Sequence, residues 1–285
     1  MTAMEPVAAL MIKHRDEFET TVASLCLSST ALGVDALRRL QQLHTTLEPQ
    51  LHAKWTTIQD LSPLPSTVHC GFLLETYAWT AVLLIALRVG QLFGALLIGP
   101  LLLGLLFNTG TLVALTYILL PVYFFVYNRK HAELTESDRR MLLLALALVL
   151  GATSGYLTSE RMLPVDAPLP FVLPLVVAIS AQALGVRLAS NRRLFLAVTM
   201  GASAGVYMLF GAATGQLEMA YMLMVAITVT VSTVQLQLTI GDANIIVSQL
   251  SGLVLALYTQ LLFLALFGSS KYHDDGVVPE PLQPF

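Results

Sequence analysis

The chain has 285 residues, of which 56% are hydrophobic and only 12% are charged, and its formal net charge is −3. A soluble domain carries about 25% charged residues, so this composition excludes an ordinary water-soluble protein and predicts a chain surrounded mainly by lipid. The slight negative charge also excludes a nucleic-acid partner, which requires a basic patch. Two cysteines, Cys26 and Cys70, are too few for a disulfide framework.

Residues 1–70 differ from the rest because charged residues are spread through them. Leucines recur there at steps of three or four, as on one face of an amphipathic helix. They are Leu37, Leu40, Leu43, Leu47 and Leu51. The proline-containing segment Ser62–Ser66 then ends the region as a linker. We expect a soluble, helical N-terminal extension in the cytosol rather than a signal peptide, because acidic residues follow the first short apolar run.

Seven apolar segments follow residue 70, and a bilayer crossing needs roughly 20 such residues. They lie at 75–98, 101–127, 141–158, 168–188, 194–213, 218–238 and 243–268. The predicted fold class is therefore all-α, a multi-pass membrane helical bundle of about seven transmembrane helices at residues 71–268, followed by a polar tail at 269–285. Pro100 leaves the division of residues 75–127 open. The sequence also does not decide whether the last segment spans or re-enters the membrane.

Basic residues in the loops predict the orientation, since Lys and Arg are retained on the cytosolic side. Two loops, at 128–140 and 187–193, hold most of them: Arg129, Lys130, Arg139, Arg140, Arg187, Arg192 and Arg193. The loop at 159–167 holds only Arg161, and the loop at 213–218 holds none. We therefore expect a cytosolic N-terminus, with the tail on the opposite side if all seven segments cross.

Four segments carry a family resemblance: residues 62–79 (SPLPSTVHCGFLLETYAW), 138–157 (DRRMLLLALALVLGATSGYL), 190–210 (SNRRLFLAVTMGASAGVYMLF) and 231–267 (VSTVQLQLTIGDANIIVSQLSGLVLALYTQLLFLALF). Their order and spacing resemble the Bax inhibitor-1 family (the TMBIM group) over residues 62–268. The resemblance implies a pH-sensitive calcium leak in an internal membrane, above all the endoplasmic reticulum, and a role in calcium homeostasis and stress-induced cell death. It implies the lipid bilayer, calcium or protons, and other membrane proteins as partners.

The calcium leak of that family is attributed to a pair of carboxylates in the sixth and seventh crossings, because two close acids in low dielectric share a proton. Here the sixth-crossing position aligns with Thr233, and the seventh-crossing positions align with Ser251 and Leu255. Calcium conduction is therefore left open by the resemblance itself. A non-conducting membrane scaffold that acts through protein partners is the alternative, and an unrelated small secondary transporter is a further one.

Polar side chains inside the spans are candidates for a functional site, because burying them in lipid is unfavourable. Arg88 is the clearest ionisable residue there, and it either lines a cavity or reaches the headgroups. We predict one polar cavity or gate with four lining residues: Arg88, Thr233, Gln235 and Ser251. Hydrogen bonds between helices are the other interpretation of the uncharged residues. Asp242, in a short polar loop, is either a turn and N-cap residue or a gating carboxylate.

Glycine pairs four residues apart predict close helix packing, since a missing side chain lets two backbones approach. We expect such packing within the chain at Gly151, Gly155, Gly201 and Gly205. No enzyme signature occurs in the sequence, which has no HExxH, P-loop or GxSxG motif. We therefore expect no catalytic activity, no cofactor and no metal site.

Overall fold

The computed structural model describes residues 48–49, 52–64, 70–131, 133–188, 190–242 and 244–270. The chain divides into two compact units, Met1–Thr57 and Ile58–Phe285. In the first unit, the described residues 48–49 and 52–57 are helical. The predicted leucine stripe and the tail beyond residue 270 lie outside the described residues.

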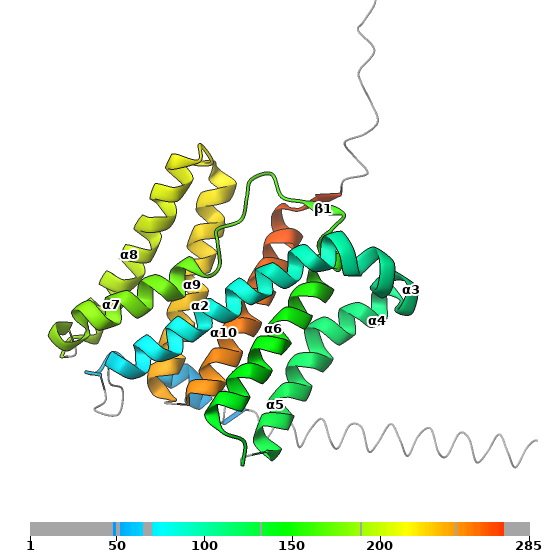
Figure 1. Ribbon diagram of the computed structural model, residues 1–285. Coiled ribbons are helices and arrows are strands. Elements are labelled where there is room, and N and C mark those ends of the chain that lie inside the picture. The colour runs from blue at the N-terminus through cyan, green and yellow to red at the C-terminus, as the bar shows by residue number, and fades with distance from the viewer. Residues whose placement is uncertain are drawn as a thin grey trace, which may run out of the picture. The chain divides into compact units, whose positions relative to one another are not determined.

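The described part of the second unit consists of helices, their connecting loops and two very short strands, which confirms the predicted all-α bundle (Figure 1). Among its described residues, six helices are long and apolar enough to cross a membrane, and α7 is a shorter apolar helix. This architecture is compatible with a multi-pass membrane protein. The elements are α2 (Cys70–Phe93), η1 (Gly94–Leu103), α3 (Gly104–Leu106), α4 (Thr109–Ala114), η2 (Leu115–Leu119), α5 (Leu120–Lys130), α6 (Glu136–Thr158), β1 (Arg161–Met162), α7 (Val172–Leu188), α8 (Arg192–Ala213), α9 (Met219–Gly241), α10 (Ile245–Phe267) and β2 (Ser269–Ser270).

Two helical runs form the region of residues 75–127, whose division into helices the sequence left open. The first passes from α2 through the π-helical η1, which contains Pro100, into α3. Proline has no N–H to donate to the carbonyl four residues earlier, and a wider π turn accommodates such a break. The second run has its π-helical segment, η2, just before Pro121. Pro121 cannot donate to the carbonyl of Tyr117, and the Tyr258 hydroxyl of α10 donates to it instead, at 2.5 Å.

Ionic contacts identify one end of the bundle, which we call the basic end. Arg140 at the start of α6 pairs with Glu75 near the start of α2 at 2.5 Å. Arg192 at the start of α8 pairs with Asp60 at 3.5 Å and donates to the amide oxygen of Gln237 near the end of α9. The starts of α2, α6 and α8 and the end of α9 therefore lie at this end. The basic loops lie there as well, so the positive-inside rule assigns this end to the cytosol, which stays a prediction.

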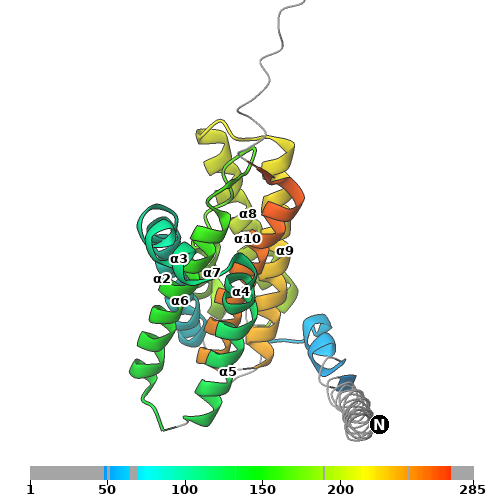
Figure 2. The same ribbon diagram turned by 90° about the vertical axis from the view of Figure 1, so that its right-hand side faces the viewer.

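The helix α10 runs from the basic end to the opposite end. At its start, Ile245 and Ile246 line a surface cleft together with Leu134 from the loop before α6. At its end, β2 pairs antiparallel with β1, which follows α6, and Arg161 lies opposite Ser270. In both views α10 passes through the bundle without turning back (Figures 1 and 2). In a bilayer, the last segment would therefore span rather than re-enter.

Two apolar clusters fill the second unit, and α2 contributes to both of them. The first cluster joins the early part of α2 to α7, α8 and α9, with Tyr77, Phe195 and Met224 among its buried members. The second joins the later part of α2 to α5, α6 and α10 and includes Leu87 and Leu253. Because lipid gives little hydrophobic drive for helices to associate, close packing and interhelical hydrogen bonds must hold these layers together.

Glycines form the contact between α2 and α6. A Cβ built on Gly90 or Gly151 would overlap backbone atoms of the facing helix, and the same holds for Gly94 and Gly155. These four glycines therefore allow the two backbones to touch. The prediction of close packing is wrong for Gly201 and Gly205, because a Cβ on either meets no described atom within 4 Å.

Candidate functional site

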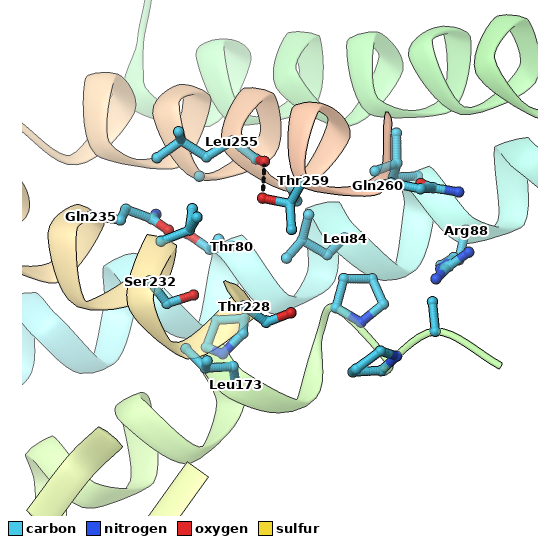
Figure 3. A pocket seen from close by; sticks show the side chains of 18 of the residues that line it. Thr80, Leu84, Arg88, Leu173, Thr228, Ser232, Gln235, Leu255, Thr259 and Gln260 are labelled. Atoms are coloured by element: carbon cyan, nitrogen blue, oxygen red, sulfur yellow. Dashed lines mark hydrogen bonds between the residues drawn. The ribbon is translucent and has the colours of Figure 1, made fainter. Parts of the chain in front are cut away.

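A pocket with a mostly apolar lining and a few polar side chains lies between α2, α9, α10 and the segment that leads into α7 (Figure 3). Its helical lining residues recur at steps of three or four, which places them on one face of each helix. They include Thr80, Leu84 and Arg88 on α2, Thr228, Ser232 and Gln235 on α9, and Gly252, Ala256, Thr259 and Gln260 on α10. Members of both apolar clusters border the pocket, so it lies where the two clusters meet.

The segment before α7 closes one side of the pocket with prolines. Pro168 and Pro170 line it in a non-helical stretch. Such backbone is tolerated at membrane depth where protein buries it or where it lines a cavity, and proline has no N–H that would need a partner. The Tyr207 hydroxyl donates to the carbonyl of Leu169 at 2.9 Å and holds this segment against α8.

The pocket is small. About 50 Å³ inside it is open to water, and a single buried water requires about 10–15 Å³ on this measure. The pocket therefore has room for a few waters or a small ion, and it is too small for a drug-sized ligand.

Arg88 lies beside Gln260 at one end of the pocket, with Gln235 at the other end (Figure 3). The Nη1 of Arg88 donates to the Oε1 of Gln91 at 3.1 Å. The Nε2 of Gln91 in turn donates to the Oε1 of Gln260 at 2.6 Å and to the hydroxyl of Ser154 at 3.3 Å. This network of four side chains joins α2, α6 and α10.

Most hydroxyls that line the pocket donate to their own helix. Thr80, Thr228 and Thr259 each donate to the carbonyl four residues earlier, at 2.7–2.8 Å. The oxygen atoms of these hydroxyls can still accept hydrogen bonds, whereas their protons are donated within the helix. Among the described lining residues, Arg88 is the one cationic donor, and none is an aspartate or a glutamate.

The structure brings together only two of the four residues predicted to share a cavity. Arg88 and Gln235 line the pocket, but Thr233 and Ser251 do not. Their neighbours Ser232 and Gly252 lie there instead, since one residue turns a helix face by about 100°. The hydroxyls of Thr233 and Ser251 donate to carbonyls of their own helices, at 2.7 and 2.8 Å. The prediction is wrong for Thr233 and Ser251 because they were chosen by their alignment with a family motif and not by the helix face on which they lie.

Three lining or network residues, Gly252, Gln91 and Gln260, were not among the four assigned to the predicted cavity, although the sequence marks Gln91 and Gln260 as polar residues within the spans. A Cβ on Gly252 would overlap the amide nitrogen of Gln235, so the glycine lets that amide lie against α10. Gln91 follows Arg88 by three residues, a spacing at which helical side chains meet, and this signal was available in the sequence. The partnership of Gln91 with Gln260 spans 169 positions, and no local pattern indicates it.

Asp242 lies at the basic end and does not line the pocket. It is exposed, and its carbonyl accepts the N–H of Asn244 at 2.7 Å in the turn between α9 and α10. Asn244, rather than Asp242, caps α10, since its side-chain oxygen accepts the N–H of Val247 at 3.2 Å. The prediction of an N-cap is therefore wrong for Asp242, although the residue lies in the turn.

The pocket does not suit a calcium ion. Calcium takes six to eight oxygen ligands, usually including carboxylates, and the described lining offers no carboxylate while Arg88 repels a cation. In the part of the chain that the structure describes, no group of three His, Cys, Asp or Glu side chains lies close enough to hold a metal.

Comparison with known families overturns the Bax inhibitor-1 resemblance. A family model described as Interactor of ZYG-11 matches residues 5–270, which is most of the chain and includes the N-terminal region that the resemblance left out. No curated protein and no solved structure matches the chain. The predicted calcium leak and the roles in calcium homeostasis and cell death are therefore wrong.

Proposed function

The chain belongs to the family described as Interactor of ZYG-11, and we infer that it is a membrane-embedded protein that acts by binding a protein partner of the ZYG-11 kind. The match over residues 5–270 is the observation that carries this proposal. The family description names an interaction and no reaction. A non-catalytic scaffold or regulator, without cofactor, is accordingly the role that we propose.

The interior of the bundle supports the role of a rigid anchor. Glycines let α2 and α6 touch along their backbones, and Gln91 joins α2 to α6 and α10. Sliding these helices past one another would break both kinds of contact. A transport cycle needs such movement of one helix group against another, so the packing favours an anchor over a transporter.

A soluble partner reaches only the parts of the chain outside the membrane. At the basic end, two loops and the helix starts that follow them form a surface cleft lined by Leu134, Glu136, Arg139, Asn244, Ile245 and Ile246. The cleft offers apolar and charged side chains side by side, as protein interfaces do. We propose it as the partner-facing surface of the membrane unit.

Co-purification of the full-length chain with a ZYG-11-type protein tests the interaction. Tagged chain extracted in mild detergent is expected to retain the partner through washing, and failure of the wild-type chain to retain it would refute the proposed function. The variant Leu134→Arg places a charge in the cleft and is expected to lower retention by about fivefold or more, since interface residues that matter contribute over 1 kcal/mol.

Leu217→Arg is the matched control, because Leu217 is 47% exposed in the loop between α8 and α9 at the opposite end. It is expected to retain the partner as the wild type does. If Leu134→Arg also retains the partner fully, the cleft is the wrong surface, while the interaction itself stands.

The membrane and the orientation belong to the same proposal. We place the basic end in the cytosol, because seven basic loop residues lie at that end. The endoplasmic reticulum is the internal membrane that we propose, and the loop charges support the orientation alone. Glycosylation acceptor sites inserted after residue 164 and after residue 134 test the orientation in microsomes. Only the first is expected to be modified, and modification of the second alone would reverse the orientation.

A further inference from the structure

Arg88 carries a charge that the described chain leaves largely uncompensated. A guanidinium has five N–H donors, and Arg88 uses one, toward Gln91 at 3.1 Å. Its Nε is buried and has no hydrogen-bond partner among the described residues. Within the described chain, no carboxylate oxygen lies within 4.0 Å of it. An arginine inside a membrane protein needs a counter-charge, because desolvation without one is strongly unfavourable.

The nearest candidate within the chain is Asp166, whose charge acts on Arg88 from the loop before α7. That carboxylate is exposed, and it accepts a hydrogen bond from the Nε2 of Gln216 at 2.8 Å. No ion pair within 4.0 Å joins Asp166 to Arg88 among the described residues. The amide oxygens of Gln91 and Gln260 do not neutralise Arg88 either, because an amide carries no formal charge.

The N–H donors of Arg88 that are not used by Gln91 favour a ligand from outside the chain. We propose that the pocket is an anion site, in which Arg88 binds one small inorganic anion of halide size. The space open to water, about 50 Å³, holds such an ion with a water or two. The described lining has no acidic residue that would repel the ion. This inference is independent of partner binding.

Chloride-35 NMR on the full-length protein in a nonionic detergent tests the site directly. Exchange with a bound site broadens the chloride signal, and bromide is expected to reverse the broadening by competition. Thermal unfolding provides a second readout, with chloride exchanged for gluconate at constant ionic strength. The midpoint temperature is expected to be higher in chloride, because a ligand that binds the native state stabilises it. Absence of broadening beyond that of a detergent blank would overturn the proposal.

Two variants distinguish a specific anion-binding site from general effects of salt. Arg88→Gln is expected to lower chloride affinity at least about tenfold, the loss of a charge-assisted hydrogen bond. Asp166→Asn keeps an acceptor for Gln216 but removes the nearby negative charge, so chloride affinity is expected to rise roughly two- to tenfold. This second variant raises the affinity and therefore cannot be explained by misfolding. Unchanged affinity in both variants would overturn the assignment to Arg88.

The phosphate of a membrane lipid is the competing source of negative charge. Phosphatidylglycerol added to the micelles distinguishes the two sources. If it raises the midpoint temperature in gluconate and abolishes the response to chloride, a lipid phosphate occupies Arg88 and the halide site is refuted. If the chloride response persists at the same affinity, the anion site stands.

Discussion

Gly151 gives the sharpest test of how this bundle is held together. A Cβ on Gly151 would lie closer than 3.0 Å to backbone atoms of α2, at Leu87 and Gly90. Backbone atoms cannot rotate away as a side chain can. The substitution Gly151→Ala therefore requires the two helices to separate by roughly 1 Å to restore normal carbon contacts of about 3.5 Å.

The expected loss follows from the packing that the separation breaks. Inserting a methyl group into a close contact typically lowers stability by about 1–3 kcal/mol, and membrane helices have little hydrophobic drive to offset it. A small gain from the higher helix propensity of alanine, about 1 kcal/mol at most, opposes the loss. We therefore expect a net loss of about 1–2 kcal/mol and a midpoint temperature about 2–8 °C below that of the wild type, at the usual 2–4 °C per kcal/mol for a chain of this size.

Gly201→Ala is the matched control, since it makes the same change in a membrane-length helix. A Cβ there meets no described atom within 4 Å, so the midpoint is expected to stay the same or rise slightly. Both variants are unfolded in the same detergent and followed by tryptophan fluorescence. Equal midpoints for the two variants, or a lower midpoint for Gly201→Ala, would refute the claim that α2 and α6 meet through their glycines.

Two further predictions concern polar contacts of the bundle. Tyr258→Phe removes the hydroxyl that donates to the Tyr117 carbonyl, to which Pro121 cannot donate. The variant is expected to lower the free energy of unfolding by about 1 kcal/mol. Tyr123→Phe, at a side chain that is 66% exposed, is the control and is expected to leave the free energy of unfolding unchanged in the same melting assay. The pKa of Asp60 lies below its ordinary value of 3.8, chiefly because the backbone N–H of Ser62 donates to it and with a smaller contribution from Arg192. Its stabilising contribution is complete above pH 3.8 and is lost as the pH falls through the lower folded pKa. In melts below about pH 4, the midpoint temperature of the wild type is therefore expected to fall more than that of Asp60→Asn. An equal fall in both proteins would contradict this.

The helices were predictable wherever length and hydropathy alone decide the structure. The predicted segments 194–213, 218–238 and 243–268 fall within a few residues of α8, α9 and α10. The start of α6 was placed too late, at 141 instead of Glu136. Its first turn is polar but well capped, since the side chain of Thr135 accepts the N–H of Asp138. Hydropathy detects the lipid-facing part of a helix and misses a polar turn that extends beyond it.

The fourth apolar segment shows where composition stops deciding the structure. Residues 168–188 are mostly apolar and were predicted as one crossing, yet α7 begins only at Val172. Pro168 and Pro170 keep the preceding residues out of a helix, and they line the pocket instead. Apolarity here marks burial against other helices, which a hydropathy pattern does not separate from contact with lipid.

Contacts between distant segments account for the remaining misses. The pairs Gly151/Gly155 and Gly201/Gly205 have the same spacing, but only the first pair lies against another helix. The spacing permits close approach and does not supply the partner. The same limit applies to the pocket, since the helix face that each residue occupies follows from the packing of α2, α9 and α10 and not from the polarity of any single position.

The failed family resemblance carries a physical lesson of its own. Any multi-pass bundle needs apolar segments of similar length, joined by loops in which basic residues alternate with neutral ones. Order and spacing of spans therefore recur among unrelated proteins and distinguish them poorly. Ionisable residues within the spans distinguish them better, because each one is unfavourable unless it has a use. At Thr233 and Ser251 the carboxylates were missing, whereas Arg88 was present in α2. A buried acid pair would attract a cation, and a buried arginine attracts an anion. The sign of the charge inside the spans thus already argued against a calcium pathway before any fold was known.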